Sequence, residues 1–280
     1  MKLGIALGRV NPAFFVETTL EAERLGYESV WMPEHLVFTL DMSGSPHLDD
    51  GDVALPATSP VQDVFAYLGH LAALTTRIRL GTNVYNVGLR HPFTVARGVT
   101  TVDRLSNGRL EFGIGASWLR QEWEAAQLDF ATRGARVDEA LAICQRLWTE
   151  SVIEHHGEHF DFQPVAFEPK PAQAPHPPIL VGGESGAALR RAARIGDGWI
   201  GMGHTPESVV DRVTRLQQLR EEHGTADRPF TVTVESQTVD KADIEAWEDA
   251  GVDRLIVSPW ARSKDALEGM RALAADVLSS

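Results

Sequence analysis

The sequence predicts an α/β protein, a closed (β/α)8 TIM barrel with insertion loops after its second and fourth strands. Short runs rich in Val, Ile and Leu recur eight times, and a segment with helical spacing of apolar residues follows each one. Strict alternation of strand and helix requires parallel strands with right-handed crossovers, and eight such units close into a barrel. The length of 280 residues suits one such domain, covering residues 1–280. Alternation alone also fits an open doubly wound sheet.

The expected elements follow one another regularly along the chain. The strands are expected at residues 3–7, 28–32, 78–84, 110–114, 179–181, 198–200, 231–235 and 254–257. The helices are expected at residues 12–25, 61–74, 94–105, 133–148, 186–195, 206–222, 242–250 and 264–278. Gly26, Gly196 and Gly251 stand just after the first, fifth and seventh helices, where glycine commonly ends a helix.

Two long segments, residues 33–60 and 150–178, interrupt the alternation of strands and helices, and both are expected to follow strands. Long loops in compact domains are usually functional, and the loops after barrel strands build the active-site face. Residues 36–59 are therefore a candidate lid or substrate wall. The second segment is expected to hold a hairpin, with residues 152–154 paired to 159–162 about Gly157.

Composition excludes several classes of function. The net charge of −13 argues against a nucleic-acid groove or binding to an anionic membrane, because both need a basic face. A single cysteine, Cys144, excludes an intrachain disulfide and favours a reducing compartment. The sequence has no stretch approaching the roughly 20 apolar residues of a membrane span and no secretory leader pattern. We therefore expect a cytoplasmic protein that acts on a small molecule.

A glycine-rich turn follows the expected fifth strand and opens the next helix. It contains Gly182, Gly183, Glu184 and Ser185. Paired glycines let a phosphate approach the backbone, Ser185 can cap the helix, and the helix N-terminus supplies unpaired N–H groups. The sequence is neither GxGxxG nor a Walker motif, so a structural turn that binds nothing is the alternative.

His35 is the candidate catalytic residue, together with the adjacent Glu34. Both follow the second strand directly, which places them at the expected mouth of the barrel. An imidazole there can transfer protons or hydrogen-bond a reacting centre.

A histidine-rich segment, residues 154–159, raises a metal hypothesis because His155 and His159 have the spacing of one helix face. Gly157 between them disfavours that helix, so a solvated hairpin without metal is preferred. No HExxH motif or third ligand accompanies the pair.

Five of the seven tryptophans divide into two groups. Trp148, Trp199 and Trp247 fall within strand or helix patterns and are expected in the core. Trp118 and Trp260 stand on loops after strands and are the candidates for stacking on a ligand ring.

The order and spacing of many short motifs resemble the luciferase-like monooxygenase superfamily over nearly the whole chain. These motifs lie at residues 3–6, 22–27, 29–31, 34–35, 79–82, 90–92, 105–109, 113–118, 133–136 and 182–183, with Glu122. The pattern around residues 115–122 and the short length are most similar to the F420-dependent oxidoreductase subgroup.

This resemblance implies a deazaflavin, coenzyme F420, at the barrel mouth, with FMN as the alternative cofactor. The phosphate would lie near the ends of strands five and six. A bulge after strand three, often with a non-prolyl cis peptide and here at residues 83–84, would back the ring. The residues implied to contact the cofactor are Asn83, Val84, Ala116, Ser117, Gly182, Gly183, Glu184, Ser185, Gly201 and Met202. His35 would lie near the reacting centre.

Departures from the family pattern leave alternatives open. Deazaflavin sugar-phosphate dehydrogenases of this superfamily carry an acid near the position of Trp118 and an Asp at that of Glu34, so their proton-transfer scheme is not carried over. The expected reaction is hydride transfer between F420 and an unidentified small organic substrate. The alternatives are an FMN-dependent two-component monooxygenase, a non-catalytic flavin-binding barrel and, less consistent with the residues, a metal-dependent hydrolase. The family also implies a homodimer and a separate flavin or F420 reductase.

Overall fold

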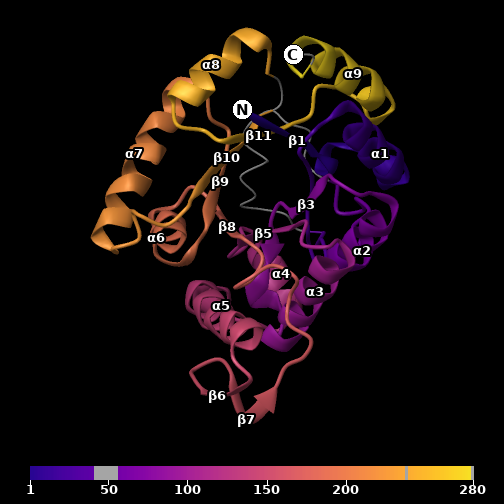
Figure 1. Cartoon of the computed structure of the whole chain (residues 1–280). Helices are drawn as coiled ribbons and strands as arrows, with labels where there is room; N and C mark the ends of the chain where they lie inside the picture. The colour runs from indigo at the N-terminus through magenta and orange to yellow at the C-terminus, as the bar shows by residue number, and fades with distance from the viewer. Residues whose placement is uncertain (41–55, 237–238, 279–280) are drawn as a thin grey trace.

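Eight parallel strands form a closed barrel in the computed structural model, which describes residues 1–40, 56–236 and 239–278 (Figure 1). Neighbouring strands pair in the order β3-β2-β1-β11-β10-β9-β8-β5, and pairing of β3 with β5 closes the ring. The closure confirms the barrel and excludes the open sheet. The strands are β1 (Lys2–Ala6), β2 (Ser29–Met32), β3 (Arg79–Thr82), β5 (Leu110–Gly115), β8 (Ile179–Gly182), β9 (Gly198–Met202), β10 (Thr231–Ser236) and β11 (Arg254–Val257).

A ring of helices surrounds the strands, and each expected helix begins within about three residues of its expected start (Figure 1). Gly26 ends α1 in a left-handed conformation with φ of 91°, as its position predicted. The sequence did not predict the short helix α4 (Arg120–Ala125). The others are α1 (Phe15–Leu25), α2 (Val64–Leu74), α3 (Pro92–Leu105), α5 (Arg133–Thr149), α6 (Gly186–Ile195), α7 (Pro206–Glu222), α8 (Lys241–Asp249) and α9 (Ala266–Val277).

The third strand is shorter than the sequence predicted. It was expected to run through residue 84, but β3 ends at Thr82, and the peptide bond between Asn83 and Val84 is cis. The chain then returns to the sheet as β4 (Tyr85–Asn86), which pairs with β5. The local sequence did not locate this interruption, because the interruption depends on tertiary packing. The cis bond lies where the family resemblance implied it.

The segment after α5 forms an antiparallel hairpin of β6 (Val152–His156) and β7 (Asp161–Ala166), which projects away from the barrel (Figure 1). The expectation that this insertion directly follows a strand was wrong, because α5 precedes it. The predicted hairpin is confirmed, with Gly157 in its turn. Its second strand begins at Asp161, so the expectation that His159 belongs to that strand was wrong. The other insertion, the candidate lid at residues 36–59, lies largely outside the described residues.

The inside of the barrel is filled by a small apolar cluster from five strands. Its buried members are Ala6, Trp31, Leu180, Ile200 and Ile256. The large Trp31 ring fits because Gly4 and Gly81, on the neighbouring strands β1 and β3, have no side chains in its path. The barrel is therefore a packed core with a solid floor beneath its mouth. The predicted core residues Trp148, Trp199 and Trp247 are all buried.

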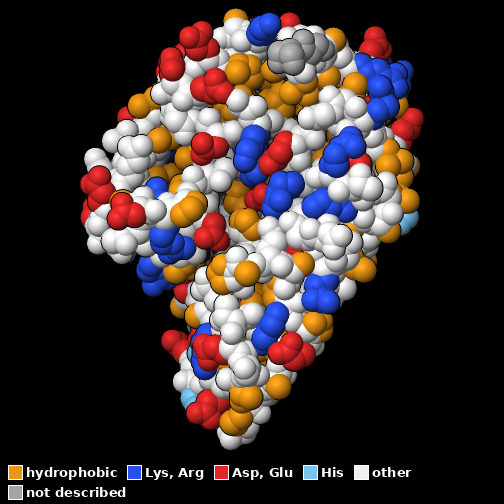
Figure 2. Space-filling model, in the orientation of Figure 1, with side chains coloured by type: hydrophobic (Ala, Val, Ile, Leu, Met, Phe, Trp, Pro, Cys, Tyr) orange, Lys and Arg blue, Asp and Glu red, His pale blue; other side chains and the backbone are white. Residues whose placement is uncertain are grey.

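Basic and acidic side chains are interspersed on the face shown in Figure 2, with apolar side chains between them. Mixed charge of this kind offers no extended basic area to a polyanion on that face. Within the described part of the chain, none of the helices has the length and apolar character needed to cross a bilayer.

Candidate active site

The carboxyl ends of the parallel strands meet at one mouth of the barrel. Residues 34–35 follow β2, residues 83–84 follow β3, residues 116–118 follow β5 and residues 183–185 follow β8, while Met202 ends β9. The structure therefore brings every residue of the predicted site to the same end of the molecule. In barrels of this kind that end carries the chemistry.

His35 is held in place by Glu122, a residue of α4. Nδ1 of His35 lies 3.1 Å from Oε2 of Glu122. The other carboxylate oxygen accepts hydrogen bonds from the backbone N–H groups of Leu36 at 2.6 Å and Val37 at 3.3 Å. The Glu122 side chain is fully buried, whereas that of His35 retains 13% exposure. Glu122 thus ties the loop after β2 to α4 and orients the imidazole.

Aromatic side chains flank the His35 ring. The ring centroid of Phe38 lies 4.6 Å from that of His35, and Trp118 meets the imidazole edge to face at 5.4 Å. The sequence proposed Trp118 for ring stacking but gave no signal for Phe38. Trp260, the other candidate, donates its indole N–H to the carbonyl of Arg9 at 3.0 Å. The aromatic side chains of Phe38 and Trp118 therefore contact the imidazole.

The Glu34 carboxylate is engaged by the protein itself. One oxygen is paired with Arg90, and the other accepts the backbone N–H of Asn86 at 2.9 Å. Burial raises the pKa of Glu34, and the Arg90 guanidinium works against that rise. The observed bonds link the end of β2 to β4, the strand that follows the cis peptide. A direct catalytic contact by Glu34 stays a prediction.

Val84 packs at the mouth end of the barrel, where two glycines make room for it. A Cβ on Gly115 would lie 2.7 Å from Val84, and one on Gly182 would lie 2.8 Å away. Val84 also packs on the apolar cluster inside the barrel. Its neighbour Asn83 donates from its side-chain amide to Glu235 of β10 at 2.8 Å, across the barrel. The result is a fixed apolar floor on which a flat ring could rest.

The turn after β8 has the features of a phosphate cradle. Gly183 has φ of +117°, which side chains rarely tolerate, and it is exposed. Ser185 caps α6 by accepting the N–H of Ala188 at 3.2 Å, and the first residues of that helix, Gly186 and Ala187, are exposed. Helix N-termini present unpaired N–H groups and the positive end of the dipole. An anion such as a phosphate fits this turn.

Glu184 within the turn joins two neighbouring loops. Its carboxylate accepts the backbone N–H of Met202 at 3.0 Å, and it pairs with His204 at 3.0 Å and with Arg212 at 3.3 Å. These bonds tie the loop after β8 to the loop after β9. A direct contact of Glu184 with a cofactor stays a prediction, and the sequence had not singled out His204 or Arg212.

The remaining predicted cofactor residues line the rim. Met202 is 44% exposed, whereas Gly201 is buried against the Trp199 ring. Ala116 and Ser117 are half-buried, and Ser117 adopts a positive φ of 67°. These positions are open to a ligand at the mouth to different degrees, and Met202 is the most open.

Two histidines of β6 each pair with one carboxylate, whereas Nε2 of His159, in the turn, is buried without a hydrogen-bond partner among the described residues. His155 lies 2.9 Å from Glu139, and His156 pairs with Asp161. Within residues 1–40, 56–236 and 239–278, no group of three His, Cys, Asp or Glu side chains is arranged to hold a metal ion.

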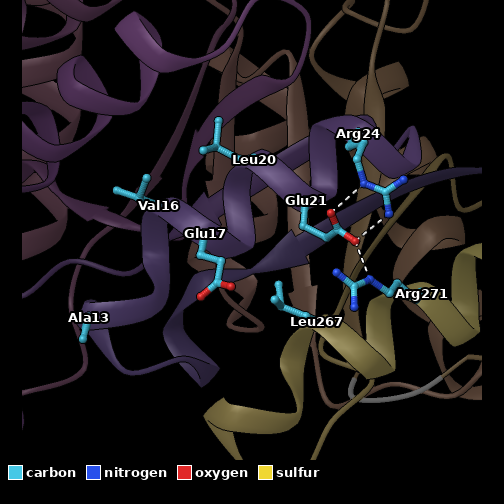
Figure 3. A pocket seen from close by; sticks show the side chains of 8 residues that line it. All are labelled: Ala13, Val16, Glu17, Leu20, Glu21, Arg24, Leu267 and Arg271. Carbon is cyan, nitrogen blue, oxygen red and sulfur yellow. Dashed lines mark hydrogen bonds and ion pairs between the residues drawn. The ribbon is translucent and has the colours of Figure 1, made fainter.

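A separate hollow of about 450 Å³ lies on the outer helix layer, between α1 and α9. Figure 3 shows Glu21 at its centre, bound to Arg24 at 2.7 Å and to Arg271 at 2.6 Å. Because it lies outside the barrel, away from His35 and the α6 N-terminus, it is not part of the candidate active site. Its ion pairs instead connect the first and last helices.

Comparison with known proteins gives a consistent assignment. An uncharacterised protein of Mycobacterium tuberculosis is 33% identical over 261 residues, which cover 92% of this chain and 88% of the relative. An F420-dependent glucose-6-phosphate dehydrogenase of Nakamurella multipartita is 30% identical over 215 residues, covering 75% and 58% of the two chains. The crystal structure of monooxygenase RslO1 from Streptomyces bottropensis superposes with a TM-score of 0.78 at 21% identity, covering 99% of each chain. The family model described as luciferase-like monooxygenase matches residues 3–276, and the chain belongs to this family.

Proposed function

We propose that this protein is an F420-dependent oxidoreductase that transfers a hydride between the deazaflavin and a small organic substrate. One observation carries the proposal. A cradle suited to a phosphate, a fixed apolar floor and an oriented imidazole lie together at the mouth of one barrel. The identity with an F420-dependent relative supports the deazaflavin. Bound F420 would supply the hydride chemistry, while the protein supplies orientation and electrostatics.

The residues at the mouth suit such a cofactor. The exposed N-terminus of α6, with Gly183 and Ser185, would hold its phosphate, because the turn leaves backbone N–H groups open to an anion. Val84 would support one face of the ring, since Gly115 and Gly182 fix its position. A Cβ at either glycine would displace Val84 from that place.

His35 would handle the proton that accompanies hydride transfer. Oxidation of an alcohol to a carbonyl releases a hydride from carbon and a proton from oxygen, and the reverse reaction takes up both. An imidazole at hydrogen-bonding distance from the oxygen is suited to either direction. The apolar wall of Phe38 and Trp118 limits access of water to that proton and favours an organic substrate with an apolar body.

The second candidate function is an FMN-dependent monooxygenase that receives reduced flavin from a separate reductase. The same cradle would accept the FMN phosphate. The similarity of the fold to that of a monooxygenase supports this candidate. We also propose a homodimer, which light scattering of the purified protein would test.

The test is a titration of the purified apoprotein with F420 and, separately, with FMN, followed by ligand fluorescence. Gly183→Asp should weaken F420 binding at least about tenfold, because it adds a side chain at positive φ and a negative charge beside the phosphate. Gly224→Asp is the matched control: it also has positive φ, with no atom near its missing Cβ, and it follows α7 away from the mouth.

Three outcomes separate the candidates. Tight F420 binding that is lost only in Gly183→Asp supports the deazaflavin assignment and the cradle. Tight FMN binding without F420 binding replaces the proposal with the monooxygenase. Binding of neither compound refutes both.

A further inference from the structure

Glu122 is a buried carboxylate that the proposed hydride transfer does not by itself use. It lies 87 positions beyond His35 in the sequence, on a different barrel unit, and its side chain is fully buried. Three groups converge on it: two backbone N–H groups from residues 36–37, which donate to it, and the imidazole of His35. A buried carboxylate is costly unless it is fully hydrogen-bonded, and this one has partners on both oxygens.

The bond to Glu122 determines which nitrogen of His35 carries hydrogen. Oε1 already accepts two N–H groups, and Oε2 faces Nδ1. An imidazole binds a proton more tightly than a carboxylate does, so the hydrogen between them belongs to Nδ1. In the neutral ring the lone pair is then on Nε2.

Nε2 is the ring nitrogen left for a substrate. Among residues 1–40, 56–236 and 239–278 it has no hydrogen-bond partner, whereas Nδ1 is bound to Glu122. The ring is also flanked by Phe38 and Trp118, which offer apolar surface on its sides. The imidazole is thus fixed at Nδ1 and open at Nε2.

We propose that Glu122 is a positioning residue: it holds His35 as the Nδ1–H tautomer and stabilises the imidazolium that forms when Nε2 takes the substrate proton. This inference rests on the proposed function for the proton-transfer step. In alcohol oxidation the hydrogen of the C–H bond would leave with its electron pair as a hydride to the cofactor. The O–H bond breaks, its electron pair forms the second bond of the carbonyl group, and the proton moves to Nε2. The positive charge then lies against the Glu122 carboxylate. In the reverse direction Nε2 returns the proton to oxygen.

A purely structural role is the competing explanation, because Glu122 also caps the backbone of Leu36 and Val37. Glu122→Gln separates the two roles. The amide oxygen can still accept the backbone N–H groups, while the amide nitrogen replaces the oxygen that faces Nδ1. That nitrogen is a donor, so it pairs only with an unprotonated Nδ1 and forces the Nε2–H tautomer.

The experiment is ¹⁵N NMR of the histidine rings at a pH where His35 is neutral, without cofactor or substrate. His35→Asn assigns the His35 signals among the ten histidines of the chain. Glu124→Gln is the matched control, since the same change is made on the same helix at a side chain that is 60% exposed. Circular dichroism establishes that each variant folds.

We expect the Nδ1–H tautomer in the wild type and in Glu124→Gln, and the Nε2–H tautomer in Glu122→Gln. An Nε2–H tautomer in the wild type overturns the proposal without reference to any variant. An unchanged Nδ1–H tautomer in folded Glu122→Gln also overturns it, because only the backbone-capping role would then remain.

Catalytic activity is measured after the titration has shown which cofactor the protein binds. Glu122→Gln should lower kcat on the order of 10²-fold with little change in KM, because its effect is on proton transfer rather than on binding. A loss confined to KM would contradict the positioning role. The NMR experiment needs neither cofactor nor substrate. Its result can therefore be interpreted even if the protein does not bind F420.

Discussion

Replacing Arg254 with Met should destabilise the barrel strongly while leaving its mouth intact. Arg254 begins β11, at the end of the barrel opposite the mouth, and it is 2% exposed. Its guanidinium binds both oxygens of Glu28, at 2.8 and 3.0 Å, and lies 3.3 Å from Glu111. It also stands over the Trp31 ring, 5.2 Å from the centroid. One buried cation therefore bridges the carboxylates of Glu28, just before β2, and Glu111 of β5.

The cost can be estimated from what the substitution leaves behind. Removing one partner of a buried ion pair typically costs about 3–5 kcal/mol, because the other charge stays buried without compensation. Glu111 keeps Arg79, and the Glu28 side chain is 22% exposed and can reach water, so we expect about 3 kcal/mol. For a chain of this length that is a fall in Tm of about 5 °C. Burial tends to raise the pKa of Glu28, but the Arg254 charge lowers it overall, so this stabilisation is present at neutral pH and is lost on acidification.

The assay is thermal unfolding followed by circular dichroism, with Arg271→Met as the control. Arg271 also binds a glutamate, but it is 56% exposed, so its loss should cost at most about 1 kcal/mol. Cofactor affinity of Arg254→Met at low temperature should match that of the wild type. Equal costs for the two variants would refute the view that burial makes the Arg254 pairing strong.

Three further outcomes test other parts of the structure. Gly81→Ala should cost about 1–3 kcal/mol in the same assay, because its Cβ would overlap the buried Trp31 ring; a cost near zero would contradict the tight packing inside the barrel. The hydrogen bond from Arg24, with a further contribution from Arg271, lowers the pKa of Glu21 from 4.5 to about 2. The stability that the Glu21 carboxylate contributes is therefore present above pH 4.5 and lost as the pH falls toward 2. The small difference in Tm between wild type and Glu21→Gln should vanish over that range, and a difference that grows would argue against the pairing. Burial raises the pKa of the Cys144 thiol, so thiol reagents should label it only as the chain unfolds. Rapid labelling of the native protein would contradict this and would show that the structure around Cys144 opens locally.

The barrel could be predicted from sequence because its determinants are local and repeated. Each strand is a short apolar run, each helix has a periodic apolar face, and turn glycines such as Gly26 separate them. The interruption at residues 83–84 gave no local signal. Val84 occupies its place because Gly115 and Gly182, on two other strands, leave the room for it. Only the family resemblance pointed there.

Candidate site residues could be placed at the mouth by one rule, that functional groups follow barrel strands. The rule locates a residue, but it does not say where the side chain binds. Glu34 and His35 are adjacent and both follow β2, yet the Glu34 carboxylate is paired with Arg90 while the His35 imidazole is bound to Glu122. Glu184 likewise stands in the expected turn, and its partners Arg212 and His204 come from the next barrel unit.

The pairing of His35 with Glu122 shows why this second step requires the structure. Glu122 lies on a helix of six residues that the sequence did not predict, and a glutamate is rarely fully buried. It becomes functional in the proposed mechanism only because the barrel brings the loop after β5 against the loop after β2. The partner of a histidine decides which ring nitrogen can exchange a proton, so the sequence could nominate His35 for proton transfer but could not say through which atom. If Nε2 is that atom, then substitutions at Glu122 should change proton transfer even though its carboxylate never touches the substrate.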